Sequence, residues 1–267
     1  SSTTLYTATS STSVPCSTSG TQNIVVDCSS VPVTLLNFNG ERKTGFNILR
    51  NAFLSNEISA AKWVIEKFNL SQEHLAEFAE AFVNPLVLAA QLGNVEMMRF
   101  AVENCGIKKD STSIADERRD ESGKNALQMA VFHGQMSAFK FALDELGLKI
   151  DYSASKESTL FIAFEGGHLE MIDYLMNNYT FNPLPKTPDG LTLLHAAATS
   201  NHPAAMQRAC QLGIDINSAD NRGITAVHLA ALSGKVQMLD AALELGADIK
   251  TSAEGCNVIH FATHSGN

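Results

Sequence analysis

Three segments of the chain, GLTLLHAAATSNH (190–202), GITAVHLAALSGK (223–235) and GCNVIHFATHSGN (255–267), align with one another without gaps. Their first residues are 33 and 32 positions apart, and each segment carries a histidine at the same place. A fixed period of this length is the sequence signature of a repeat protein, in which each unit stacks on its neighbours. The repeat therefore decides the fold.

The same pattern runs back through the chain in looser copies. These are ESTLFIAFEGGH (157–168), KNALQMAVFHGQ (124–135), NPLVLAAQLGN (84–94) and FNILRNAFLSNE (46–57). One apolar position recurs in every copy and is occupied by Leu49, Leu86, Leu127, Leu160, Leu194, Val227 and Ile259.

Each unit predicts two helices joined by a tight turn. The first helix is short, apolar and rich in small residues, and it ends at a turn residue such as Gly93 or Gly134. The second, for example VEMMRFAVEN (95–104), spaces its apolar residues by i, i+3 and i+4, which buries one face. A glycine such as Gly106 or Gly246 then ends the helix where a left-handed residue is needed.

The small-residue helix and the period resemble the ankyrin repeat, whose pattern is G-x-T-P-L-H-x-A-A-x-x-G followed by a second helix and G-A-D. Residues 223–249 match best and include Gly246-Ala247-Asp248. The resemblance implies an all-α ankyrin-repeat solenoid of about six to seven helix-pair repeats, with the last one truncated. We expect repeats at 45–70, 84–106, 123–151, 156–183, 189–220, 221–251 and, in part, 254–267.

Two insertions are expected between the early repeats. The stretch 71–82 predicts an extra helix, and the charged stretch 107–122 predicts an enlarged finger loop, because insertions in solenoids fall in exposed loops. The finger loop is either simply solvated or a contact for a partner.

The early repeats depart from the family pattern. No repeat has proline after the threonine position, and the histidine position holds Arg50, Val87, Gln128 or Phe161 in the earlier units. In the family, the threonine and histidine fix the turn and the helix start by hydrogen bonds. We therefore expect the N-terminal units to rely on packing instead and to be locally looser.

Residues 1–44 precede the repeats. Residues 1–22 are rich in Ser and Thr and are predicted to be disordered, whereas residues 23–38 are strand-like and suit a small hairpin or a cap over the first repeat. Cys16 and Cys28 could pair in an oxidising compartment, but a reduced cytosolic state is favoured.

Catalytic and metal chemistry find little support. Cys105, Cys210 and Cys256 lie in apolar helical patterns and are predicted to be buried thiols. Histidines one repeat apart cannot surround one ion, and no short zinc-ligand pair is present, so we expect no metal site. Phosphate-binding, hydrolase and zinc-protease motifs are missing from the sequence, so we expect no cofactor and no enzymatic activity. The alternative is a cysteine hydrolase built around Cys16 or Cys28, which needs an exposed thiolate.

Charge and hydropathy limit the kinds of partner that we expect the chain to bind. The formal net charge is −9, and an acidic surface repels the phosphates of nucleic acids. No stretch approaches the run of about 20 apolar residues that a membrane span needs, and the opening residues do not resemble a signal peptide. We expect a cytoplasmic monomer that binds another protein. We also expect the natural chain to continue beyond Asn267, because a stack end needs a polar cap.

The resemblance implies binding through the concave face of the first helices and through the finger loops. Mapped by motif, the predicted partner-binding residues are Leu54, Gln91, Leu92, Lys124, Phe132, His133, Glu165, Leu191, Thr199, Arg222 and Leu232. Ser200 and Ile224 occupy equivalent positions and are expected to be exposed as well.

Large apolar residues form a row among these positions, at Leu54, Leu92, Phe132 and Leu232. Aromatic residues are frequent hot spots, so Phe132 is predicted to contribute most; the alternative is that Phe132 or Leu92 packs into the core. The predicted function is a protein-interaction scaffold. The alternative is the targeting or substrate-recruiting arm of a larger enzyme, channel or secreted bacterial effector, which would act in the host cytosol.

Overall fold

The structure, a computed structural model, describes residues 48–71, 73–75, 84–110, 123–153, 158–181, 184–200 and 202–264. The chain divides into two compact units, Ser1–Ser71 and Gln72–Asn267, and each is described by itself. The predictions for the lead (1–44), for most of the extra helix (71–82) and for most of the finger loop (107–122) lie outside the described residues.

The first unit contains a helical segment over residues 48–54 followed by α2 (Ile58–Lys67). The turn between them includes Asn56 with a φ of 65°, a left-handed value that asparagine adopts more readily than most residues. Leu49 and Phe53 of the first segment and Val64 of α2 are buried. The apolar spacing of this segment therefore produces a helix pair, as predicted.

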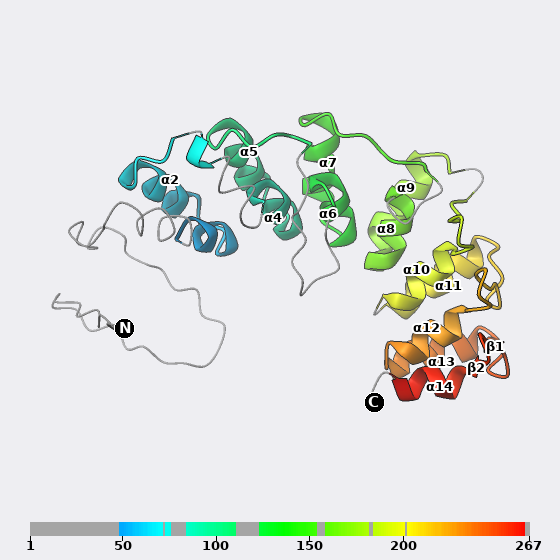
Figure 1. The fold of residues 1–267 in the computed structure, drawn as a ribbon. Coiled ribbons are helices and arrows are strands. Elements are labelled where there is room, and N and C mark those ends of the chain that lie inside the picture. The colour runs from blue at the N-terminus through cyan, green and yellow to red at the C-terminus, as the bar shows by residue number, and fades with distance from the viewer. Residues whose placement is uncertain are drawn as a thin grey trace, which may run out of the picture. The chain divides into compact units, whose positions relative to one another are not determined.

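The second unit is a series of helix pairs (Figure 1). The pairs are α4 (Pro85–Leu92) with α5 (Val95–Glu103), α6 (Ala126–Phe132) with α7 (Met136–Asp144), α8 (Thr159–Gly166) with α9 (Leu169–Asn178), α10 (Leu193–Thr199) with α11 (Pro203–Gln211), and α12 (Ala226–Leu232) with α13 (Val236–Glu244). An antiparallel hairpin of β1 (Ser252–Ala253) and β2 (Cys256–Asn257) then leads into α14 (Val258–His264). The predicted helical repeat stack is confirmed.

The first helices of the pairs pack against one another in series, from α4 through α6, α8, α10 and α12 to α14. Buried alanines such as Ala90, Ala197 and Ala230 allow this close approach, because a short side chain keeps neighbouring helices near each other. The recurrent apolar position is buried from Leu86 to Val227. In α14 the same position, Ile259, is 71% exposed.

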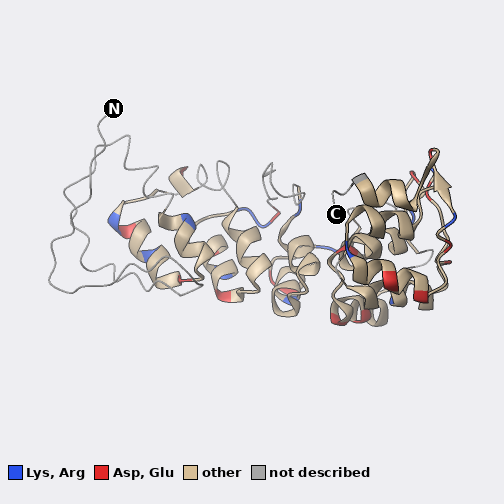
Figure 2. Ribbon diagram, turned by 90° about the horizontal axis from the view of Figure 1, so that it is seen from below, with Lys and Arg blue, Asp and Glu red and all other residues tan. Residues whose placement is uncertain are grey.

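The second helices bury one apolar face and carry charge on the other. Arg99 of α5 forms a two-point ion pair with Glu145 after α7, with nitrogen–oxygen distances of 2.6 and 2.8 Å. Arg208 of α11 donates from Nε to Asp173 of α9 at 2.8 Å. Acidic and basic residues are interspersed along the ribbon, most of which is uncharged (Figure 2). Two ion pairs on this side thus join neighbouring repeats.

The turn glycines are required by both conformation and space. Gly134 and Gly167 have φ values of 68° and 74°, which side chains rarely adopt. A Cβ atom on Gly134 would collide with the ring of His168, and one on Gly167 with the ring of His202. Consecutive turns therefore lie against one another along the stack.

The cysteines differ from the prediction that all are buried in helices. Cys105 is buried just after α5, and burial raises the pKa of its thiol to about 12. Cys210 of α11 is only partly buried. Cys256 is exposed and lies in β2, so the prediction is wrong for this residue, because the chain forms a hairpin before α14 begins. Cys16 and Cys28 lie outside the described residues.

Candidate partner-binding surface

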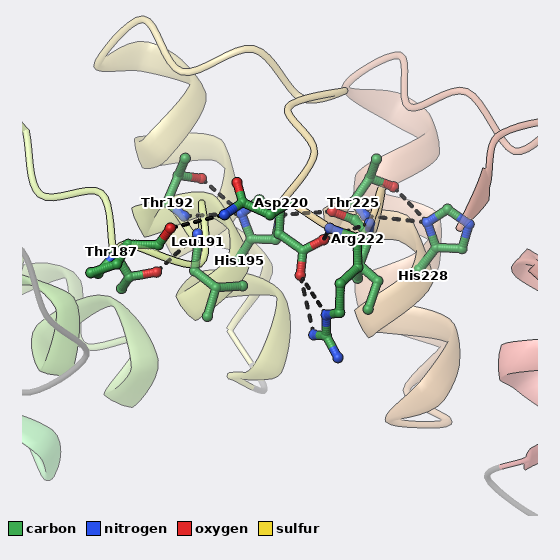
Figure 3. A network of polar contacts seen from close by, with 11 residues as sticks. Thr187, Leu191, Thr192, His195, Asp220, Arg222, Thr225 and His228 are labelled. Carbon is green, nitrogen blue, oxygen red and sulfur yellow. Dashed lines mark hydrogen bonds and ion pairs between the residues drawn. The ribbon is translucent and has the colours of Figure 1, made fainter. Parts of the chain in front are cut away.

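A polar network holds the finger turns of the C-terminal repeats (Figure 3). Thr192 donates its main-chain N–H to Nδ1 of His195 at 3.1 Å, which leaves the ring proton on Nε2. That nitrogen donates in turn to the carbonyl oxygen of Ile224 at 3.0 Å, in the next repeat. His195 is buried, and burial lowers its pKa although the Ile224 carbonyl opposes the shift. One neutral imidazole therefore fixes both a helix start and the following finger.

The next finger is held by a buried carboxylate. Asp220 accepts main-chain hydrogen bonds from Ile224 at 2.8 Å and Arg222 at 2.9 Å, and its other oxygen pairs with the Arg222 guanidinium at 3.1 Å. Burial tends to raise the pKa of Asp220, but these bonds outweigh it and the pKa is lowered. Asn221 also bonds back to the carbonyl oxygens of Pro188 and Asp189 at 2.9 Å, so consecutive fingers are tied together.

The second Thr–His pair meets the next repeat differently, with the His228 ring 4.9 Å from that of Phe261 in α14. Thr225 donates its main-chain N–H to Nδ1 of His228 at 3.2 Å, as in the preceding repeat. Nε2 of His228 is buried and makes no hydrogen bond of ordinary geometry with the described residues. Burial lowers the pKa of His228, and the main chain of Thr251 offsets this only in part.

The earlier repeats are also capped by hydrogen bonds, which corrects the expectation that they rely on packing alone. Asn125 and Gln128 form a reciprocal capping box, with main-chain to side-chain distances of 2.9 and 3.0 Å. The side chain of Asn84 accepts from Leu86 at 3.0 Å, and that of Ser158 accepts from Phe161 at 3.3 Å. The expectation failed because Asn and Ser supply the acceptor that Thr and His supply elsewhere.

The first helices present an almost uncharged surface. Among α4, α6, α8, α10, α12 and α14, only α8 contains a charged residue, Glu165. Leu92 at the end of α4 is 42% exposed, and Leu232 at the end of α12 is 37% exposed. This apolar surface contrasts with the paired charges of the second helices.

Phe132 lies between these two leucines along the series, at the end of α6, and is partly buried. Its ring meets that of His133 edge-on with centroids 5.1 Å apart, and the ammonium of Lys124 lies 5.1 Å from its centroid. Its carbonyl oxygen packs against Gly166 of α8, where a side chain would not fit. The structure thus brings three predicted residues, Lys124, Phe132 and His133, into one cluster.

The other predicted residues are distributed along the stack. Gln91, Glu165 and Leu191 are partly buried, and Thr199 and Arg222 are exposed. Leu54 is 43% exposed but belongs to the first unit, so it is not assigned to the same row. Ser200 and Ile224 are buried, contrary to expectation, because Ser200 bonds to Ala197 and Ile224 supports the His195 link.

Sequence reasoning missed the first residues of the second helices. Leu169 and Val236 are 38% and 68% exposed, and Glu96 and Glu170 follow the helix starts of α5 and α9 on the surface. The motif describes the first helix and the fingers, so it gives no signal for these positions. The only available signal was an apolar residue directly after a turn.

Other kinds of site receive no support from the described residues. In that part of the chain no three His, Cys, Asp or Glu side chains gather in a way that could hold a metal ion. Nor is any of its helices both long and apolar enough to cross a bilayer.

Comparison with known sequences agrees with this architecture. A family model described as ankyrin repeats (many copies) matches residues 86–143 and 194–243, which run from α4 into α7 and from α10 into α13. No curated protein matches the chain. Since the matched segments coincide with stacked helix pairs, these parts of the chain are ankyrin repeats.

Proposed function

We propose that this chain is a protein-interaction scaffold that binds its partner along the first-helix side of the stack, with Phe132 and Leu92 at the centre of the contact. Ankyrin repeats generally mediate protein–protein interaction and are typically not enzymes. The observation that carries the proposal is the contrast between the two sides of the stack. The second helices carry charged residues, of which Arg99 and Arg208 pair across repeats, whereas the first helices leave apolar side chains exposed on an almost uncharged surface.

The network around His195 and Asp220 supports the same role. Buried hydrogen bonds between consecutive fingers hold the surface in one arrangement before a partner arrives. A preorganised surface loses less conformational entropy on binding, so more of the contact energy appears as affinity.

The proposal is tested by affinity capture with the immobilised native chain and with the double variant Leu92→Ala, Phe132→Ala. The native chain should retain a partner protein that the variant loses. The matched control is Leu243→Ala with Ile249→Ala, which removes two exposed apolar side chains from elsewhere on the stack and should retain the partner. Circular dichroism must show the same helical content in all three proteins.

Equal retention by the native chain and the double variant would contradict the proposal. So would a cooperative loss of helical structure in the double variant, because Phe132 or Leu92 would then be a core residue.

A further inference from the structure

The turns at the ends of α4, α6 and α8 form one continuous edge, which we define as residues 91–96, 132–137 and 165–170 and call the turn edge. Each turn lies against the next: a Cβ atom on Gly93 would collide with Gln135, and one on Gly134 with His168. A partner that lies on the first helices at Leu92 and Phe132 reaches this edge.

The turn edge combines apolar side chains with carboxylates. Leu92 and Leu169 are exposed and Phe132 is partly buried, while Glu96 and Glu170 are exposed and Glu165 is partly buried. The three segments that define the edge contain no Lys or Arg. A basic residue, Lys124, contacts Phe132, with its ammonium 5.1 Å from the ring centroid.

The exposed carboxylates of the edge differ from those that pair across repeats. Glu145 and Asp173 are paired with arginines of neighbouring repeats. Glu96 and Glu170 make no ion pair or hydrogen bond with the described residues. Their place in the first turn of α5 and α9 suits the helix dipole, but that does not account for the exposed leucines beside them.

Covering this edge with a purely apolar partner would be unfavourable. Contact with Leu92 and Leu169 removes water from Glu96 and Glu170, and a desolvated carboxylate without a partner is strongly destabilising. A partner that brings Lys or Arg to both carboxylates avoids that loss and gains charge-assisted hydrogen bonds.

We propose that the turn edge binds a basic amphipathic helix, whose apolar face covers Leu92, Phe132 and Leu169 and whose Lys or Arg side chains reach Glu96 and Glu170. This inference rests on the proposed function. Neighbouring packed helices are about 10 Å apart, so the two carboxylates, separated by two repeats, lie about 20 Å apart. An α-helix covers that distance in about 13 residues.

The test uses two 18-residue helical peptides of the same amphipathic pattern, one of Leu and Lys and one of Leu and Glu, titrated calorimetrically against the native chain. The lysine peptide should bind and the glutamate peptide should not. Glu96→Lys with Glu170→Lys should lower the affinity for the lysine peptide about tenfold or more, because two attractive charge pairs become repulsive. The matched control, Asp240→Lys with Glu244→Lys on α13, changes the net charge equally and should weaken it less than about threefold.

Equal weakening in both charge-reversal variants would overturn the inference, since it would show general attraction to an acidic chain. In another outcome, Leu92→Ala with Phe132→Ala weakens binding of the lysine peptide and Glu96→Lys with Glu170→Lys has no effect. That result would support the apolar binding surface and contradict the need for a cationic partner. If the charge-reversal variant has a lower unfolding temperature than the native chain, Glu96→Gln with Glu170→Gln replaces it, because glutamine keeps the shape of the side chain. Weaker binding of the lysine peptide by this variant is expected. Unchanged binding would contradict the inference.

Discussion

The pairs from α4 to α9 and the pairs from α10 to α13 are built alike, with different side chains at the starts of their first helices. In the second group, Thr192 and Thr225 pair with histidines in the family pattern. In the first group, Asn84, Asn125 and Ser158 provide the acceptor instead. What the backbone requires at this position is an acceptor for the free N–H groups of the first turn, and several side chains meet that need.

The two groups of repeats also differ in where their characteristic residues lie, in the interior or on the surface. The motif histidines His195 and His228 are buried, so the repeats that match the pattern best use it for internal hydrogen bonds. Leu92, Phe132, Glu96 and Glu170 all lie in the divergent repeats, on the surface that we propose for binding. Divergence from the motif therefore does not indicate a weaker fold here.

The largest expected effect tests whether the divergent repeats pack as closely as the others. Gly166→Ala places a Cβ atom against the carbonyl oxygen of Phe132, which cannot move without shifting α6. We expect a loss of about 3 kcal/mol in the free energy of unfolding, measured by urea titration. Gly147→Ala is the control, because a Cβ atom there meets no neighbouring atom. The only cost is the left-handed backbone, with a φ of 71°, so the free energy of unfolding should fall by about 1 kcal/mol. Equal losses would show that α6 and α8 are not in close contact.

The two kinds of cap should differ in strength because only one reaches the next repeat. His195→Leu leaves the Thr192 N–H without its acceptor and removes the bond to the Ile224 carbonyl, which then keeps only the Asp220 N–H, for an expected loss of about 2 kcal/mol. Gln128→Leu removes the bond from the Asn125 N–H, which lies within the same repeat, and should lose about 1 kcal/mol. Chemical denaturation of both variants checks this, and an equal or larger loss in Gln128→Leu would contradict the inter-repeat role of His195.

The smallest expected effect is a pH dependence centred on the turn histidines. The ring of His168 lies 5.4 Å from that of His202, and burial, followed by the charge of His202, lowers the pKa of His168. Burial also lowers the pKa values of His195 and His228. Each contributes stability that is fully present above the unfolded-state pKa of about 6.5 and lost as the pH falls below it.

The free energy of unfolding should therefore be lower at pH 5 than at pH 7.5. His168→Gln is used to isolate the share of this histidine. The variant should show a smaller difference between the two pH values than the native chain. An unchanged difference would assign the pH dependence entirely to the other histidines.

The stack itself was predictable because its evidence is periodic. Apolar spacing and turn glycines located the helix pairs, and even the loosest copies kept Leu86, Leu127 and Leu160 in phase and buried. The caps of the early repeats were not predicted, because the family pattern led to a search for Thr and His rather than for any acceptor. A single Asn before an apolar run, as at Asn84, is a cap signal that the repeat pattern obscured.

The surface was predictable only in part. The motif correctly placed Leu92 and Leu232 at exposed helix ends, but it gave Ser200 and Ile224 the same status although local hydrogen bonds bury them. Glu96 and Glu170 could not be recognised, since a carboxylate in the first turn of a helix is common for local electrostatic reasons. What sets these two apart is their place beside Leu92 and Leu169 on the turn edge, which only the three-dimensional structure shows.

Amide hydrogen exchange of the native chain, with and without its captured partner, tests the central claim most directly. Binding along the divergent repeats predicts slower exchange in residues 91–96, 132–137 and 165–170, with little change in the outer parts of α7 and α9. Protection confined to the second helices, or to residues 194–264, would contradict the claim.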